Sequence, residues 1–124
     1  MENESILDSI KKVLGIQPNY DVFDLDILMH INSVFNILHQ LGIGPDAGFA
    51  IQDEHDTWNT FLKDDPLLNT VKTYVYLRVK MIFDPPSTSF TQQAIKEQIQ
   101  ELEWRLSAHR EGTLATQVIL ISDS

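Results

Sequence analysis

Two consecutive prolines divide the second half of the chain. Asp84-Pro85-Pro86 stands between an apolar-rich run at residues 67–83 and a second periodic run that starts at Ser89 or Phe90. Each proline lacks a backbone N–H and disfavours α geometry in the residue before it. A helix therefore should not continue through this point. We expect the two flanking segments to be antiparallel or sharply angled neighbours.

The run before the prolines fits either a strand or a helix by its pattern. Apolar residues alternate from Val71 to Phe83, as in a strand. The same run also has apolar residues at the helical period: Leu68, Val71, Val75, Val79 and Ile82. The run is longer than the usual strand of about five or six residues. In addition, Asp65 can cap a helix whose first residue is Pro66. These arguments favour a long helix. Its apolar residues are distributed around most of the helix circumference, so the helix should contact several neighbouring elements.

The run after the prolines predicts a second helix followed by a different kind of segment. Ser89 and Gln92 fit a capping box. Gly112 suits a helix C-terminus. Between them, apolar residues recur at steps of four, three and four: Ile95, Ile99, Leu102 and Leu106. Beyond Gly112 stand four consecutive β-prone apolar residues, Val118, Ile119, Leu120 and Ile121. We expect residues 113–124 to form an extended arm that pairs as a strand with a neighbouring chain.

The first half of the chain predicts shorter helices separated by turns. Periodic apolar residues favour helices at 5–14 and 23–41, which Gly15 and Gly42 would end. A short helix is expected after Asp56 as its cap, and residues 49–51 could form a short strand. The predicted fold is mainly α: a small helical bundle with a long central helix, a Pro-Pro corner and an extended C-terminal tail. We expect a helical domain at 1–112 and the arm at 113–124.

The charge is negative and unevenly distributed. The formal net charge is −9, and no Lys or Arg occurs between Val13 and Leu62. That segment carries seven acidic residues: Asp21, Asp24, Asp26, Asp46, Asp53, Glu54 and Asp56. A protein that wraps nucleic acid needs a basic surface, so this distribution argues against that function. Two interpretations stay open: a solvated surface that aids solubility, or a surface that repels a polyanion.

The residues offer little chemistry. The chain has no cysteine, no Gly-rich phosphate loop and no common hydrolase motif. His30 and His39 are nine residues apart, on opposite sides of a helix, so they cannot share one metal ion. Asp53 to Asp56 are consecutive, and consecutive side chains rarely converge on one ligand. We predict neither a catalytic site nor a metal site. No apolar run is long enough to cross a membrane, and the first residues do not form a signal peptide.

The order of several blocks along the chain carries a family resemblance. The blocks are residues 7–15, 22–33, 58–62, 71–86 and 99–106, and the most specific phrases are His30-Ile31-Asn32-Ser33 and Phe83-Asp84-Pro85-Pro86. Together they cover most of residues 5–107. This ordered set resembles the small head–tail connector, or adaptor, proteins of tailed bacteriophages. The segment beyond Gly112 lies outside the resemblance.

The resemblance implies a structural virion protein without enzymatic activity or cofactor, made in the host cytoplasm. In the family, copies form a ring, a dodecamer, below the portal of the capsid. The ring extends the DNA channel and presents a platform for the stopper or tail-completion protein. DNA passes through without specific binding, and the C-terminal segments tend to reach toward the portal. The seven acidic residues would then be candidates for the channel wall, and Val118 to Ile121 for binding the portal or a neighbour. The alternative is a small acidic helical regulator that binds a host or phage protein in solution.

Overall fold

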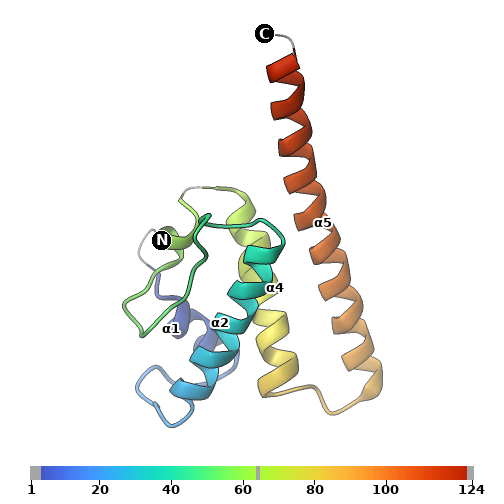
Figure 1. Ribbon diagram of the computed structural model, residues 1–124. Coiled ribbons are helices and arrows are strands. Elements are labelled where there is room, and N and C mark those ends of the chain that lie inside the picture. The colour runs from blue at the N-terminus through green and yellow to red at the C-terminus, as the bar shows by residue number, and fades with distance from the viewer. Residues whose placement is uncertain (1–3, 64, 123–124) are drawn as a thin grey trace.

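The computed structural model describes residues 4–63 and 65–122, with side chains described as far as residue 109. The described chain forms five helices: α1 (Ile6–Val13), α2 (Asp24–Gln40), α3 (Trp58–Phe61), α4 (Leu67–Phe83) and α5 (Ser89–Ser122). Figure 1 shows α4 in the middle of the bundle, with α2 and α5 packed against it. Within the described residues there is no strand, only one isolated bridge between Ser5 and Thr57. The prediction of a mainly α bundle is confirmed.

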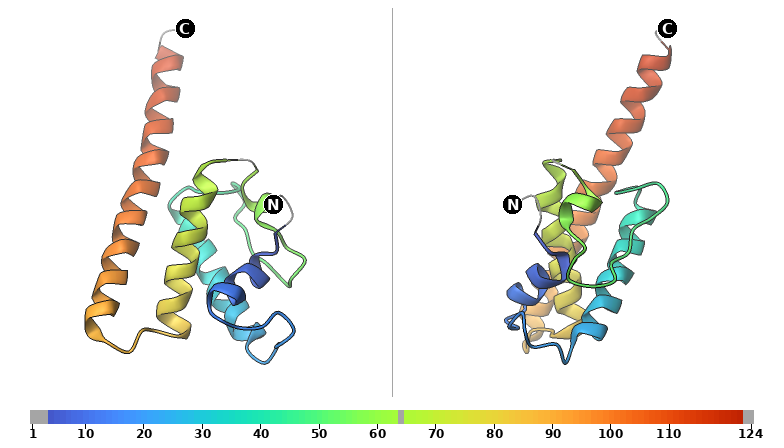
Figure 2. Two further views of the ribbon diagram at one scale, coloured as in Figure 1. Left: turned by 180° about the vertical axis from the view of Figure 1, so that it is seen from behind. Right: turned by 90° about the vertical axis from the view of Figure 1, so that its left-hand side faces the viewer.

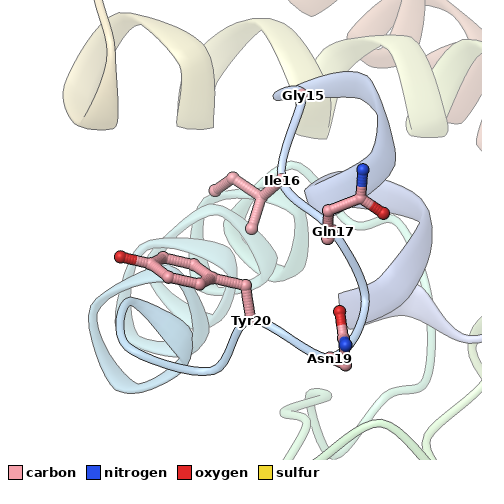
Figure 3. Close-up of a pocket in the computed structure, with 5 residues that line it drawn as sticks. All are labelled: Gly15, Ile16, Gln17, Asn19 and Tyr20. Carbon is pink, nitrogen blue, oxygen red and sulfur yellow. The ribbon is translucent and has the colours of Figure 1, made fainter.

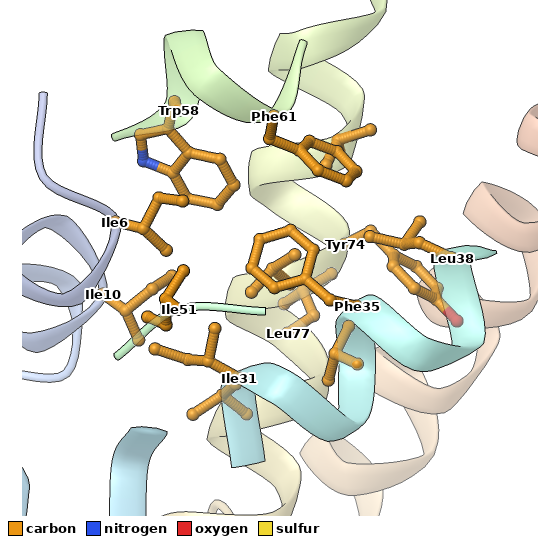
Figure 4. Close-up of a cluster of buried hydrophobic side chains, with 14 of the residues drawn as sticks. Ile6, Ile10, Ile31, Phe35, Leu38, Ile51, Trp58, Phe61, Tyr74 and Leu77 are labelled. Carbon is orange, nitrogen blue, oxygen red and sulfur yellow. The ribbon is translucent and has the colours of Figure 1, made fainter. Parts of the chain in front are cut away.

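The hydrophobic core lies where α1, α2, α3 and α4 meet (Figure 4). Phe35 of α2 is its centre, because its ring lies 4.7 Å from that of Phe61 and 6.1 Å from that of Trp58, centroid to centroid. Burying one large apolar side chain contributes about 1.5–3 kcal/mol. From α4, fully buried side chains face this core and the α5 side: Val71, Tyr74, Val75 and Val79. The expectation that this helix contacts several neighbours is confirmed.

Ser5 and Asp65 cap the helices that follow them, as predicted, and each does so through a side-chain hydrogen bond. The Ser5 hydroxyl accepts from the backbone N–H of Asp8 at 3.2 Å. The Asp65 carboxylate accepts from the N–H of Leu67 at 2.9 Å, with Pro66 already in α conformation. Each side chain satisfies a donor that the first helical turn leaves free. After α1, Gly15 adopts a φ of 81°, a left-handed conformation that glycine adopts without strain.

The Pro-Pro corner turns the chain back on itself, as predicted. Helix α4 ends at Phe83, and α5 begins at Ser89 and runs antiparallel to α4 (Figures 1 and 2). The predicted capping box is displaced by one residue, because the Thr88 hydroxyl, not that of Ser89, accepts from the N–H of Thr91 at 3.2 Å. The Gln92 side chain donates instead to the carbonyl of Pro86 at 2.7 Å. Gln92 therefore ties the first turn of α5 to the corner.

The prediction of an extended arm at 113–124 is wrong for residues 113–122, which the structure describes as helix. Helix α5 continues through Gly112 to Ser122 and projects past the end of the bundle in all three views, while residues 123–124 lie outside the described residues. An interior glycine costs only about 1 kcal/mol relative to alanine, and extending an existing helix avoids the cost of nucleation. In the sequence, Leu114, Val118 and Ile121 are also spaced at the helical period. The prediction that this segment pairs as a strand is therefore replaced by a continuation of helix α5.

Two smaller expectations in the first half are also corrected. Residues 49–51 form no strand, since Ile51 is held by a side chain of α2 that takes the place of a strand partner. Asp56 does not cap α3. Its carboxylate accepts from the N–H groups of Gln52 and Asp53, at 2.6 and 3.3 Å, and so closes the preceding turn. Local sequence does not distinguish these two uses of an aspartate.

Candidate functional surfaces

Asn32 of α2 fixes the long loop between α2 and α3. Its side-chain oxygen accepts from the N–H of Ile51 at 2.7 Å, and its side-chain nitrogen donates to the carbonyl of Ile51 at 2.9 Å. Both backbone groups of a residue that is only 3% exposed are thereby satisfied. This contact gives a structural reason for an asparagine in the phrase His30-Ile31-Asn32-Ser33. It sets the position of the loop that carries four of the seven acidic residues.

The seven acidic candidates lie in three places and not on one continuous face. Asp21, Asp24 and Asp26 are at the start of α2, and Asp46 follows its other end, so roughly 25 Å of helix separates them. Asp53, Glu54 and Asp56 lie in the loop that Asn32 holds. Five of the seven are exposed: Asp21, Asp26, Asp46, Asp53 and Glu54. Asp56 has the turn-closing contacts described above, and Asp24 has a structural partner.

That partner of Asp24 is Lys11, whose side chain is 1% exposed. The Lys11 ammonium lies 2.8 Å from the Asp24 carboxylate and donates to the carbonyl of Pro18 at 2.9 Å. Burying an ammonium group without a counter-charge is costly. The two contacts therefore join α1, the following loop and the start of α2. Asp24 serves this junction, which the charge pattern alone did not reveal.

Asp53, Glu54 and His55 come closer together than expected for consecutive residues. One ligand atom from each lies within 4.8 Å of the others. All three side chains are exposed, and the Asp53 carboxylate already accepts from the N–H of His55 at 2.8 Å and lies 3.2 Å from its ring nitrogen. These contacts explain the cluster as a local turn. Exposed acidic groups gather in this way without binding an ion, so the cluster gives no ground for a metal site.

A polar contact of three side chains joins α4 to α5. The Glu103 carboxylate accepts from the Tyr74 hydroxyl and from the Arg78 guanidinium, both at 3.0 Å. Arg78 Nε also donates to the Tyr74 oxygen at 2.8 Å. Burial raises the pKa of Tyr74 to about 12, with Glu103 adding to the rise and Arg78 opposing it. Burial lowers the pKa of Arg78, but Tyr74 and Glu103 outweigh that effect and raise it above its ordinary value. This triad fixes the register of α5 against α4.

The triad predicts a loss of stability at high pH. The pKa of Tyr74 is higher in the folded chain than the ordinary value of 10.0, so the folded state holds the proton more tightly than the unfolded state. The free energy of unfolding should be unaffected by this group below pH 10 and should fall by about 2 kcal/mol between pH 10 and 12. Urea unfolding across this range measures the fall. Tyr74→Phe should flatten it, whereas Tyr20→Phe, at an exposed position, should not. An equal fall in wild type and Tyr74→Phe would contradict the assignment.

The cavity in Figure 3 carries no convergent catalytic groups. It has a volume of about 360 Å³ and lies in the loop after α1, lined by Gly15, Ile16, Gln17, Asn19 and Tyr20. None of these is a carboxylate, a histidine or a cation. A reaction site needs a nucleophile or base with an orienting partner, and this cavity offers no such pair. None of the described helices is both long and apolar enough to span a membrane.

Several large apolar side chains are exposed, and most of them fall into two groups. One lies around the start of α2 and includes Val22, Leu25 and Met29, at 66%, 71% and 60% exposed. The other lies along the outer side of α5 and consists of Phe90 and Trp104, at 84% and 71%. Sequence periodicity missed these surfaces, because a pattern that identifies the buried side of a helix does not show what covers the other side.

The comparison with family models decides the class of the protein. The model described as "Phage connector protein" matches residues 6–113, which is most of the chain. The chain belongs to the phage connector protein family. The match contains all of α1 to α4 and α5 as far as residue 113. No curated protein and no solved structure matches the chain.

Membership in the family confirms the resemblance read from the ordered blocks. This connector is a structural component of a phage particle, and the described bundle is the part that the family match covers. Residues 114–124, which include Val118 to Ile121, lie beyond the match. Whether these four residues bind a neighbour, and whether the acidic residues line a channel, stay predictions about this chain.

Proposed function

We propose that copies of this connector form a ring adaptor between the capsid portal and the tail or stopper, and that the ring extends the DNA channel without enzymatic activity. The family match over residues 6–113 is the observation that carries this proposal. The chain would be made in the host cytoplasm and then join the virion. The number of copies in the proposed ring is twelve, as the resemblance implies.

The shape of α5 supports contact with a second virion component. Its last turns extend past the bundle, with no other element of the same chain beside them in the three views (Figures 1 and 2). An apolar helix end of this kind fits a groove on another protein, which is a common mode of helix recognition. We therefore assign Val118, Ile119, Leu120 and Ile121 to binding the portal or a neighbouring subunit, in helical rather than strand form.

The exposed acidic residues suit the wall of a DNA channel. Carboxylates repel the phosphate backbone, and a wall without basic residues avoids the counterion-releasing contacts that hold DNA in place. Because the seven candidates lie in three places, we propose that some of the five exposed ones face the channel: Asp21, Asp26, Asp46, Asp53 and Glu54. Asp24 and Asp56 contribute to the fold through the contacts described above.

Phage particles assembled without this connector provide the test. If it joins head to tail, a phage whose gene for this chain is deleted should make heads and free tails but no joined particles. Adding the purified protein to that extract should restore joined, infectious particles. Electron microscopy and plaque counts measure the outcome. Joined, infectious particles in the absence of the protein would contradict the proposal.

A further inference from the structure

We propose that the outer face of α5 in one copy packs against the groove between α1 and α4 of the next copy, in a head-to-tail contact. Repeated around an axis, this contact would build the ring, so the inference rests on the proposed function for its biological meaning. The contact itself is argued from the surfaces of the single chain. Five observations support it.

The outer face of α5 is a narrow stripe with an aromatic residue at each end. Phe90, Ala94, Glu97, Glu101 and Trp104 follow one another at steps of four, three, four and three, so they share one side of the helix. The buried seam of the same helix, from Ile95 to Leu106, lies on the side turned toward α4. Two large aromatic side chains so widely exposed are typical of a surface that another protein covers.

The groove lies between α1 and α4. Apolar and basic side chains line it, together with the Glu4 carboxylate, which lies 2.9 Å from the Lys72 ammonium. It has a volume of about 310 Å³, and Val13, Trp58 and Tyr76 supply its apolar lining. Val13 is 50% exposed. The ammonium of Lys72 lies at the groove, 5.8 Å from the centre of the Trp58 ring. An aromatic side chain from outside would cover this exposed apolar surface.

The charges of the two surfaces are complementary. Lys12 lines the groove, and Glu97 stands between the aromatic ends of the stripe, one turn before Glu101, which is paired with Arg105 at 2.7 Å. Within the described part of the chain, neither Lys12 nor Glu97 takes part in an ion pair. Complementary charges fix the register of a contact and disfavour other pairings. A second copy of this chain carries the acidic, aromatic helix that the groove fits.

The two surfaces lie on opposite flanks of the bundle. Seen from behind, in the left view of Figure 2, α5 stands on one side of α4 and α1 on the other. A ring requires two different surfaces on opposite sides of each subunit, whereas a two-fold dimer uses one surface that pairs with itself. The arrangement of α1, α4 and α5 meets the first requirement.

The two surfaces also lie at the same height along α4. Glu103 binds Tyr74 and Arg78, which places the adjacent Trp104 beside that part of α4. The groove is lined by Lys72 and Tyr76, from the same turns. If the ring axis runs parallel to α4, rotation about it without a translation along it brings Trp104 of one copy level with the groove of the next copy. Equal height is the condition for closing a ring rather than forming an open helical filament.

Cysteine cross-linking tests the contact, because the chain has no cysteine of its own. Two single variants, Val13→Cys in the groove and Trp104→Cys on the stripe, are made with tags of different mass and treated with a short bifunctional maleimide. In the mixture, the yield of the cross-linked heterodimer should be at least about tenfold higher than the yield of either homodimer. Gln40→Cys, at an exposed position on α2, is the matched control.

A chain that carries both cysteines separates a ring from a closed dimer. It should give a ladder of cross-linked trimers and larger products, whereas a two-fold dimer would stop at two. Homodimers as abundant as the heterodimer, a ladder that stops at two, or a heterodimer no more abundant than the Gln40→Cys background would each overturn the proposal. The last result would mean that a different protein covers these surfaces. The cross-linking assay contains no portal protein. A positive cross-linking result would therefore remain valid even if the deletion experiment showed that this chain does not join heads to tails.

Discussion

Replacing Asn32 with alanine is expected to lower the free energy of unfolding by about 2–4 kcal/mol. The change removes both partners of the Ile51 backbone, the acceptor at 2.7 Å and the donor at 2.9 Å. Ile51 is 3% exposed, so water cannot easily replace them. A buried polar group left without a partner costs about 1–3 kcal/mol, and here two such groups are left together. Urea unfolding of the purified chain measures the difference.

Asn36→Ala is the matched control for this change. It removes the same side chain from the same helix at an exposed position, and it should alter the unfolding free energy by less than about 0.5 kcal/mol. Asn32→Asp keeps the acceptor for the Ile51 N–H but places a carboxylate oxygen against the Ile51 carbonyl in place of the donor, so it should also destabilise the chain clearly more than Asn36→Ala does. If Asn32→Ala were no more destabilising than Asn36→Ala, Asn32 would not be what holds the loop.

Removing residues 113–124 is expected to abolish attachment to the portal while leaving the subunit folded. The last fully buried side chain described in α5 is Leu106, so the deletion spares the described core. The removed segment is the helix end that projects past the bundle. Unfolding in urea should match that of the full chain, while the amount of protein that binds isolated portal rings should fall to background.

A milder variant separates the apolar residues from the helix that carries them. Replacing Val118, Ile119, Leu120 and Ile121 with alanine keeps high helix propensity and removes most of the apolar surface. Binding to portal should weaken at least tenfold. A truncated chain that unfolds, or one that binds as well as the full chain, would show that these residues are not the attachment point.

The parts of the fold that sequence predicts best are those decided within a few residues. The turn at Asp84-Pro85-Pro86 follows from the covalent geometry of proline. The caps at Ser5 and Asp65 follow from side chains that reach their own helix start. Family membership is likewise predictable, because it rests on an ordered set of such local blocks.

The parts that sequence does not predict depend on contacts between distant residues or on competition between neighbours. Asn32 and Ile51 are 19 residues apart, and the pairing has no local signal. Thr88 and Ser89 are both good caps, and the geometry after Pro86 selects Thr88. The apolar residues at 118–121 fit either strand or helix, and continuity with α5 decides for helix. The Lys11–Asp24 pair likewise required the packing of α1 against α2.

The mass of the assembly that this connector forms with portal protein tests the central claim most directly. Light scattering is measured on the full-length chain alone, on portal alone and on their mixture. The account predicts one discrete species in the mixture, heavier than the portal ring by several copies of the chain and absent with the chain truncated at residue 112. A mixture in which the portal keeps its own mass and the chain stays small would contradict the account, and it would favour a regulator that acts in solution.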